Sequence, residues 1–152
     1  MTRKAKKNPE LLRKGGLYLK HVEGKGRGVF CRTAIKKGEE LEVTPALILN
    51  EKATGHVDET LLMNYTFIFG SLSKSLRQQT GVKLSRNCSC VIMGIMSFCN
   101  HDQKPNAEIV WEEIDGTLYY TLQATRAIAK NTEICTVYGD HWFEERNFAD
   151  ES

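Results

Sequence analysis

The chain has 152 residues, a length that corresponds to one domain with a core of its own. Hydrophobic residues make up 41% of it and charged residues 26%, which excludes a disordered chain, and a formal net charge of +2 is too small for a protein that coats nucleic acid. No apolar run is long enough to span a membrane or to form a signal peptide, so we expect an intracellular protein of the nucleus or cytoplasm that contacts no membrane.

Basic residues are concentrated at the start of the chain, where Glu10 is the single acidic residue among the first fourteen. The basic residues there are Arg3, Lys4, Lys6, Lys7, Arg13 and Lys14. We expect residues 1–16 to form a basic N-terminal arm and residues 17–152 to form the folded domain. The composition leaves three uses of the arm open: a nuclear-import signal, a weak nucleic-acid contact, or a solvated tail.

A glycine turn separates the first two predicted strands. Residues 17–22 have an apolar pattern of β type, residues 24–28 carry three glycines, and residues 29–31 resume the apolar pattern. The turn lacks the Gly-Lys-Ser or Gly-Lys-Thr ending of a phosphate-binding loop, so we do not expect nucleoside triphosphate chemistry. A second turn at 36–38 leads into a predicted strand over 41–49.

Residues 50–86 have a mixed pattern. Polar turns are expected around Gly55 and Gly81, on either side of the apolar stretch 61–69. We expect this segment to be a variable insert of the domain.

The second half of the chain reads mainly as strands. The apolar run 88–98 predicts a buried strand or a short helix, and the polar residues 100–106 that follow predict a loop. The alternating stretch 107–112, the Asp-Gly turn at 115–116 and the stretch 118–122 form the clearest hairpin signal in the chain.

The end of the chain predicts one more strand and a helix. The strand covers 133–138, after a turn at Lys130-Asn131, and the helix covers 141–148 with Asp140 as its N-cap. The fold class expected from all these elements is mainly β with short helices.

Five cysteines lie mostly in apolar runs, which favours reduced, buried thiols over a disulfide framework. They are Cys31, Cys88, Cys90, Cys99 and Cys135. Cys88, Cys90 and Cys99 lack a convincing fourth ligand and the paired spacing of a structural zinc site. We therefore predict no metal.

Three short motifs in a fixed order carry a family resemblance. They are GKGRGVF at 24–30, SFCNHDQKPN at 97–106 and EICTVYGDHWF at 133–143, and each alone could be an ordinary turn. Together they resemble a minimal SET domain over about residues 17–148, without the cysteine-rich zinc modules that flank some members. The resemblance implies several small curved sheets with a C-terminal pseudo-knot, which is a rare exception to unthreaded topology. It also implies an S-adenosylmethionine-dependent protein-lysine N-methyltransferase, acting on a histone tail or another protein.

The resemblance also implies the cofactor site. A glycine turn approaches S-adenosylmethionine with its backbone, an asparagine holds the amino group of the cofactor, and the backbone of the next histidine reaches the adenine. An active-site tyrosine orients the methyl group, and an aromatic residue packs against the cofactor. In this sequence the matching residues are Lys25, Gly26, Arg27, Gly28, Asn100, His101, Tyr138 and Trp142.

A narrow channel for the substrate lysine is implied as well, with Tyr138 as its catalytic residue. The residues expected to line it are Tyr65, Tyr120, Thr136 and Phe143. Phe143, like Trp142, could equally be core, an aromatic such as Tyr65 in an apolar run is more often core, and Tyr120 is mainly a strand residue. A free lysine has a pKa near 10.4, so neutralising it at pH 7 costs roughly 4 to 5 kcal/mol, and a dry channel beside a cationic sulfonium lowers that cost.

The chain departs from the family pattern at four positions. Ser97 stands where an arginine is common, and Asp102 and Gln103 stand where serine and cysteine are common. Thr136 stands where a phenylalanine or tyrosine tunes the number of methyl groups added. The sequence therefore leaves the product open.

A different function remains open at this point. A SET-like module without turnover could bind a basic tail or nucleic acid through its arm. Tyr138 and the intact Asn100-His101 pair favour the enzyme. The sequence also leaves open whether the protein is a monomer or a homodimer.

Overall fold

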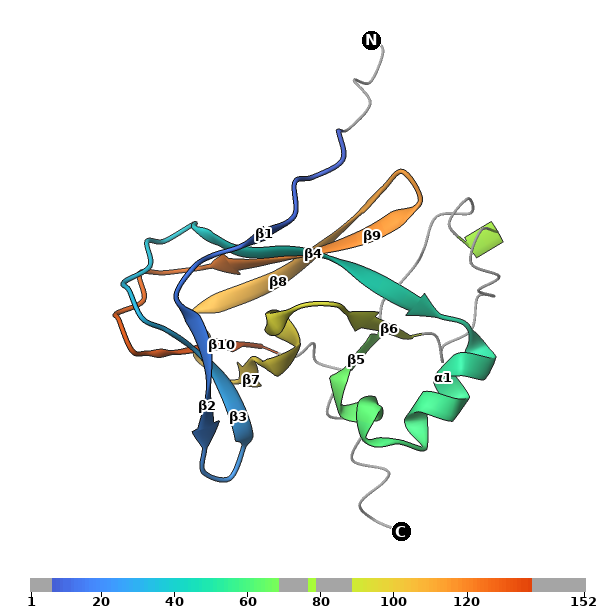
Figure 1. Ribbon diagram of the computed structural model, residues 1–152, viewed down its shortest axis with the longest axis horizontal. Helices are drawn as coiled ribbons and strands as arrows, with labels where there is room; N and C mark the ends of the chain where they lie inside the picture. Colours follow the sequence, from blue (N-terminus) through green and yellow to red (C-terminus); the bar gives the residue numbers. More distant parts are fainter. Residues whose placement is uncertain (1–6, 69–76, 79–88, 138–152) are drawn as a thin grey trace. The chain divides into compact units, whose positions relative to one another are not determined.

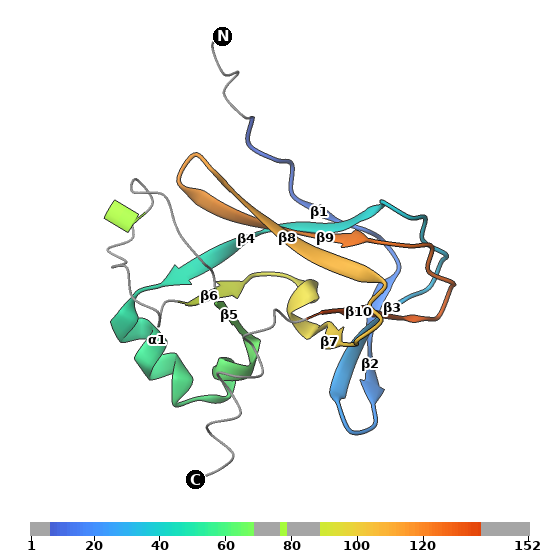
Figure 2. The same cartoon turned by 180° about the vertical axis from the view of Figure 1, so that it is seen from behind.

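The computed structural model describes residues 7–68, 77–78 and 89–137 (Figures 1 and 2). The chain divides into two compact units. The first unit consists of Met1–Gly15, Glu40–Ser97 and Ile109–Leu122, and the second of Gly16–Glu39, Phe98–Glu108 and Gln123–Ser152.

The first unit is built on a six-stranded sheet of order β5-β6-β4-β9-β8, with β1 paired to β4. The strands of this sheet are β1 (Leu12–Arg13), β4 (Glu40–Leu49), β5 (Thr66–Ile68), β6 (Ser89–Ile92), β8 (Ala107–Ile114) and β9 (Thr117–Ala124). The first two residues of β8 and the last two of β9 are counted in the second unit. Alternate residues of β9 are buried, as expected for a strand with one face on the core. Leu118, Tyr120 and Leu122 thereby join Leu41 and Met96 in the core of this unit.

The hairpin of β8 and β9 confirms its sequence signal. Asp115 and Gly116 have φ values of 48° and 75°, the left-handed conformation at both central residues that a type I′ turn requires. The Asp-Gly pair therefore sets the register of the hairpin, which is the long orange ribbon in Figure 1.

The sheet begins earlier in the chain than predicted. Leu12 and Arg13 pair with Val43 and Glu42, and the backbone N–H of Lys14 donates to the carbonyl of Leu41 at 2.8 Å. Part of the segment that we expected to be a basic arm is therefore a strand of this sheet.

A helix occupies the place of the turn expected around Gly55. Helix α1 covers Glu51–Asp58, and the Oδ1 atom of Asn50 accepts a hydrogen bond from the backbone N–H of Ala53 at 2.8 Å. An asparagine N-cap followed by Glu51 at the positive end of the helix dipole favours a helix here. A 3-10 helix, η1 (Leu61–Tyr65), follows it.

The apolar run 88–98 forms both of the elements considered for it. Strand β6 ends at Ile92, and the 3-10 helix η2 covers Ile95–Phe98. Gly94 lies between them. This position needs glycine, because a Cβ atom there would overlap the carboxylate of Glu42.

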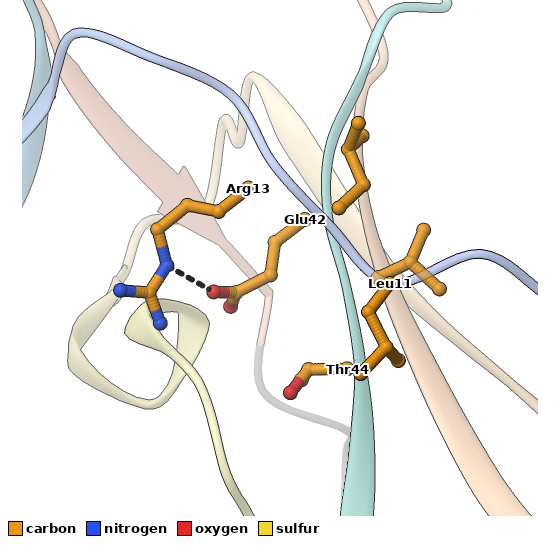
Figure 3. A pocket seen from close by; sticks show the side chains of 6 residues that line it. Leu11, Arg13, Glu42 and Thr44 are labelled. Carbon is orange, nitrogen blue, oxygen red and sulfur yellow. Dashed lines mark hydrogen bonds and ion pairs between the residues drawn. The ribbon is translucent and has the colours of Figure 1, made fainter.

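Glu42 is a buried acid that sequence patterning did not reveal. Its side chain is 1% exposed, and its carboxylate accepts hydrogen bonds from the backbone N–H groups of Ile95 and Met96 at 3.0 and 2.9 Å. Arg13 donates to it from Nε at 3.0 Å, beside an open cavity of about 290 Å³ (Figure 3). These three donors offset the cost of burying the charge.

The second unit contains a four-stranded sheet of order β2-β3-β10-β7. Its strands are β2 (Leu17–Val22), β3 (Gly26–Cys31), β7 (Asn100–His101) and β10 (Glu133–Thr136). Val29, Ile134 and the bridged pair Ile35 and Ile128 form its core. The strand-turn-strand prediction for the first glycine motif is confirmed, whereas part of the predicted loop at 100–106 is a strand.

Four of the five cysteines lie in the part of the chain that the structure describes. Cys31, Cys90, Cys99 and Cys135 are buried and form no disulfide in this part of the chain, which confirms the prediction of reduced thiols for these four. Cys88 and the predicted helix 141–148 lie outside the described residues, as does the C-terminal segment needed for the predicted pseudo-knot. Among the described residues no helix is long and apolar enough to cross a membrane.

Candidate active site

Strand β10 brings the three sequence motifs side by side in the second unit. It pairs antiparallel with β3, where Glu133 lies opposite Phe30. On its other side it pairs parallel with β7, where Cys135 lies opposite Asn100 and Thr136 opposite His101. The glycine motif, the asparagine-histidine pair and the strand before Tyr138 are thus neighbours in one sheet.

The glycine turn between β2 and β3 needs glycine for its backbone conformation. Gly24 and Gly26 have φ values of 77° and 80°, in the left-handed region that L side chains rarely adopt. A Cβ atom built on Gly26 would meet no described atom within 4 Å. The space beside Gly26 is therefore open, which suits the close approach of a ligand to the backbone.

Gly28 is required for a different reason. A Cβ atom there would overlap the carboxylate of Glu133 and would lie 3.0 Å from Nδ2 of Asn100. The absence of a side chain at Gly28 therefore lets these two polar groups meet directly over the strand.

Asn100 is held by a carboxylate that sequence reasoning missed. Its Nδ2 atom donates to Oε1 of Glu133 at 2.7 Å, the short distance typical of a hydrogen bond to an ionised acceptor. The two residues are 33 positions apart, and only the pairing of β10 with β7 brings them together. No spacing rule could have found this contact.

Asn106 has the structural role that an ordinary turn would give it. It is 8% exposed, accepts from the backbone N–H of Cys135 at 2.9 Å and donates from Nδ2 to the carbonyl of Glu133 at 2.8 Å. The N–H of Asp102 also donates to the carbonyl of Thr136 at 3.0 Å. Residues 102–106 are thereby fixed to β10 at both ends.

Thr136 carries a buried hydroxyl group without a hydrogen-bond partner in the described part of the chain. The residue is 1% exposed and lies opposite His101, which is half-buried. A buried, unpaired polar group costs about 1 to 3 kcal/mol and calls for an explanation. A ligand or water that hydrogen-bonds to this hydroxyl would remove the cost.

The basic side chains of the glycine turn have different surroundings. Arg27 places its guanidinium carbon 5.2 Å from the centre of the Phe98 ring, a cation–π contact. Lys25 is exposed, and its positive charge acts to lower the pKa of the Cys135 thiol. Burial, together with the charge of Glu133, nevertheless raises the pKa of Cys135 to about 11, so this thiol is protonated at neutral pH and is no nucleophile.

Tyr65 and Tyr120, which we expected in the lysine channel, belong to the first unit. Tyr120 is 4% exposed, its hydroxyl accepts from Sγ of Cys90 at 3.4 Å, and its ring packs on Phe67. Burial raises the pKa of Tyr120 above its usual value. Tyr65 ends η1 and is half-buried.

The remaining expected site residues, Tyr138, Trp142 and Phe143, lie outside the described residues, so their roles stay predictions. Within residues 7–68, 77–78 and 89–137, no group of three or more histidine, cysteine or acidic residues could hold a metal ion.

Comparison with known families decides whether the resemblance of the three motifs reflects membership of a family. The model of the SET domain matches residues 26–139, most of the chain. The chain belongs to the SET domain family. In this SET domain the match includes β3, β7 and β10, the three strands that carry the candidate site.

A curated relative supports the same assignment. A histone-lysine N-methyltransferase from Schizosaccharomyces pombe, named as specific for lysine 37 of histone H3, is 30% identical over 131 residues, covering 85% of this chain and 78% of the relative. The family match and this relative together indicate that the chain functions as a lysine methyltransferase.

Solved structures share the fold. A Plasmodium falciparum protein with a provisional histone methyltransferase name has a TM-score of 0.57 and 22% identity, over 86% of this chain and 98% of its own. The Neurospora SET domain protein DIM-5, a histone lysine methyltransferase, has a TM-score of 0.60 and 21% identity, over 82% of this chain and 52% of its own. The predicted fold class, mainly β with short helices in a SET domain, is confirmed.

Proposed function

We propose that this SET domain takes its methyl group from S-adenosylmethionine and transfers it to a lysine side chain of a histone or another protein. One observation carries the proposal: β10 pairs with both β3 and β7, so that the open glycine turn and Asn100 lie in the same small sheet. The other residues of the site are assigned by their place around this pair.

The polar groups of the second unit suit the amino-acid end of the cofactor. Oδ1 of Asn100 accepts no hydrogen bond from the described residues and suits an ammonium group. Lys25 is an exposed cation on the glycine turn and suits a carboxylate. No described atom covers the backbone at Gly26, which leaves space there for the rest of the cofactor. We assign cofactor contacts also to Arg27, Gly28, the backbone of His101, and Trp142.

The chemistry that the cofactor supplies is a methyl group on a positively charged sulfur. The protein then contributes chiefly alignment and electrostatics, since an in-line displacement needs the amine, the methyl carbon and the sulfur in one line. We assign the orientation of the methyl group to Tyr138. The lysine amine must lose its proton before attack, which a dry channel favours because burial disfavours the charged form.

We place Thr136 beside the reacting amine, two residues before Tyr138. Its hydroxyl, which has no hydrogen-bond partner among the described residues, can bond a water molecule or the amine itself. A small residue here leaves room that an aromatic ring would fill, so the number of methyl groups added depends on what occupies that room. Phe143 remains a candidate for another wall of the channel, whereas the roles expected for Tyr65 and Tyr120 stay predictions.

Labelled methyl transfer tests the proposal. Purified protein is incubated with labelled S-adenosylmethionine and an array of histone and other peptides, including histone H3 peptides around lysine 37, the site in the name of the relative. We expect label on lysine, and loss of transfer in Asn100→Ala and in Tyr138→Phe. Gln123→Ala is the matched control, because it removes a half-buried side chain whose amide, among the described residues, donates only to the carbonyl of Gly38.

The outcomes separate the enzyme from the inactive module. Binding of peptides without any transfer would support the SET-like module without turnover that the sequence leaves open. Full transfer in both variants would refute the assigned site while leaving the family intact. A histone product would also favour the nucleus as the place of action.

A further inference from the structure

The hydrogen bond between Asn100 and Glu133 fixes which end of the asparagine amide is available to a ligand. An ionised carboxylate accepts hydrogen bonds and has no proton to donate, whereas an amide has a donating and an accepting end. The atom of Asn100 that faces Glu133 at 2.7 Å must therefore be Nδ2. Oδ1 is then turned away from Glu133 as an acceptor.

The position of Glu133 is itself set by the surrounding strands. Its backbone pairs with Phe30 in β3, and its carbonyl accepts from Nδ2 of Asn106 at 2.8 Å. Gly28 provides the space in which the carboxylate lies, because a Cβ atom at that position would overlap it. The carboxylate is thus held on the face of the sheet that carries Asn100.

We propose that Glu133 is a positioning residue that orients the Asn100 amide so that Oδ1 accepts a hydrogen bond from the ammonium group of the cofactor. The inference rests on the proposed function, since it assumes that Asn100 binds that group. Glu133 acts here through Asn100 and not as a direct partner of the ligand. Without the carboxylate, the amide rotates freely and presents its donating end to the ammonium group for part of the time.

Calorimetric binding of three ligands tests this inference without any turnover. S-adenosylmethionine and S-adenosylhomocysteine both carry the ammonium group, and methylthioadenosine lacks it. We expect Glu133→Ala to weaken binding of the first two by about tenfold, the effect of one hydrogen bond to a charged group, and to leave methylthioadenosine unchanged. Equal weakening of all three ligands would show a merely structural role and overturn the inference.

A conservative variant separates orientation from direct ion pairing. Glu133→Gln keeps an accepting oxygen for Nδ2 of Asn100 but loses the charge. The positioning role predicts binding within about threefold of the unaltered protein, a small part of a hydrogen bond's contribution. If Glu133→Gln weakens binding as much as Glu133→Ala, the carboxylate acts by its charge and the inference is wrong.

A double variant shows whether Glu133 acts through Asn100. In the Asn100→Ala background, Glu133→Ala should have no further effect on ligand binding, because the amide that it orients is absent. Additive effects would contradict the inference. If Asn100→Ala alone leaves binding of S-adenosylmethionine unchanged, the assignment of Asn100 in the proposed function fails first. Melting curves of each variant confirm that the protein is folded.

Discussion

Asn100 and Asn106 belong to one short segment, yet the structure gives their amides different partners. Asn106 uses both Oδ1 and Nδ2 on the backbone of β10, so its side chain replaces strand pairing and is fully engaged. Among the described residues, Asn100 uses Nδ2 alone, on Glu133. Among polar residues of a loop, the amide with an accepting atom to spare is therefore the better candidate for ligand binding.

Gly28 offers the sharpest test at the scale of one residue. In Gly28→Ala, the added methyl group would overlap the Glu133 carboxylate and crowd Nδ2 of Asn100. We expect the pair to separate and affinity for S-adenosylmethionine to fall by about tenfold, the effect of one hydrogen bond to a charged group, with the fold retained because Glu133 can move. Calorimetry measures the affinity and thermal melting measures the fold.

Gly15→Ala is the matched control for that variant. A Cβ atom at Gly15 meets no described atom within 4 Å, and its backbone lies outside the left-handed region. Affinity and melting temperature should therefore stay close to those of the unaltered protein. If the two alanine variants bind the cofactor equally well, the close approach at Gly28 has no bearing on the site.

At the scale of elements, Glu42 connects three parts of the first unit. It lies on β4, accepts from Arg13 of β1, and accepts from the first two N–H groups of η2. The η2 donors have no partner within their own helix, as at the start of any helix. A single buried carboxylate thus completes η2 and attaches β1 at the same time.

Alanine variants of Glu42 and Arg13 should lower the free energy of unfolding by different amounts. Glu42→Ala leaves two η2 N–H groups without their acceptor, and we expect the free energy of unfolding to fall by about 2 to 4 kcal/mol. Arg13→Ala removes a partner whose side chain is 60% exposed, and we expect about 1 kcal/mol or less because solvent screens that pair. Urea denaturation measures both. Equal losses would mean that the ion pair, and not the η2 contact, stabilises the unit.

The elements that sequence reasoning recovered are those with local causes. The β8–β9 hairpin follows from Asp115-Gly116, and the first glycine turn follows from left-handed residues. Helix α1 was missed because Gly55 in its interior suggested a turn, although Asn50 caps the helix. Strand β7 was missed because a strand of two polar residues exists only through its pairing with β10.

At the scale of the whole chain, the candidate site also combines features with local causes and features that depend on distant segments. Short motifs identified Asn100 and the glycine turn, since each motif is continuous in sequence. Glu133 was missed as a partner of Asn100, and Glu42 as a buried acid, because both depend on contacts between distant segments. Sequence motifs therefore locate a site, whereas the hydrogen bonds that orient its side chains come from the fold.

The N-terminal arm needs a test that separates charge from folding. Deleting residues 1–8 removes Arg3, Lys4, Lys6 and Lys7 but keeps β1, whereas deleting residues 1–15 also removes β1 and Arg13. If the arm contacts nucleic acid, the shorter deletion should flatten the dependence of DNA binding on salt, because fewer counterions are released on binding. The measurement is the slope of log K against log salt concentration for a duplex.

The longer deletion should behave differently in a stability assay. Loss of β1 exposes the edge of β4 and removes one hydrogen-bonding partner of Glu42, so we expect a lower melting temperature for the 1–15 deletion and an unchanged one for the 1–8 deletion. An unchanged salt slope in the shorter deletion would leave the arm as a solvated tail. A loss of stability in that deletion would mean that residues before Pro9 also support the sheet, and the charge effect would then have to be measured by substituting the lysines singly.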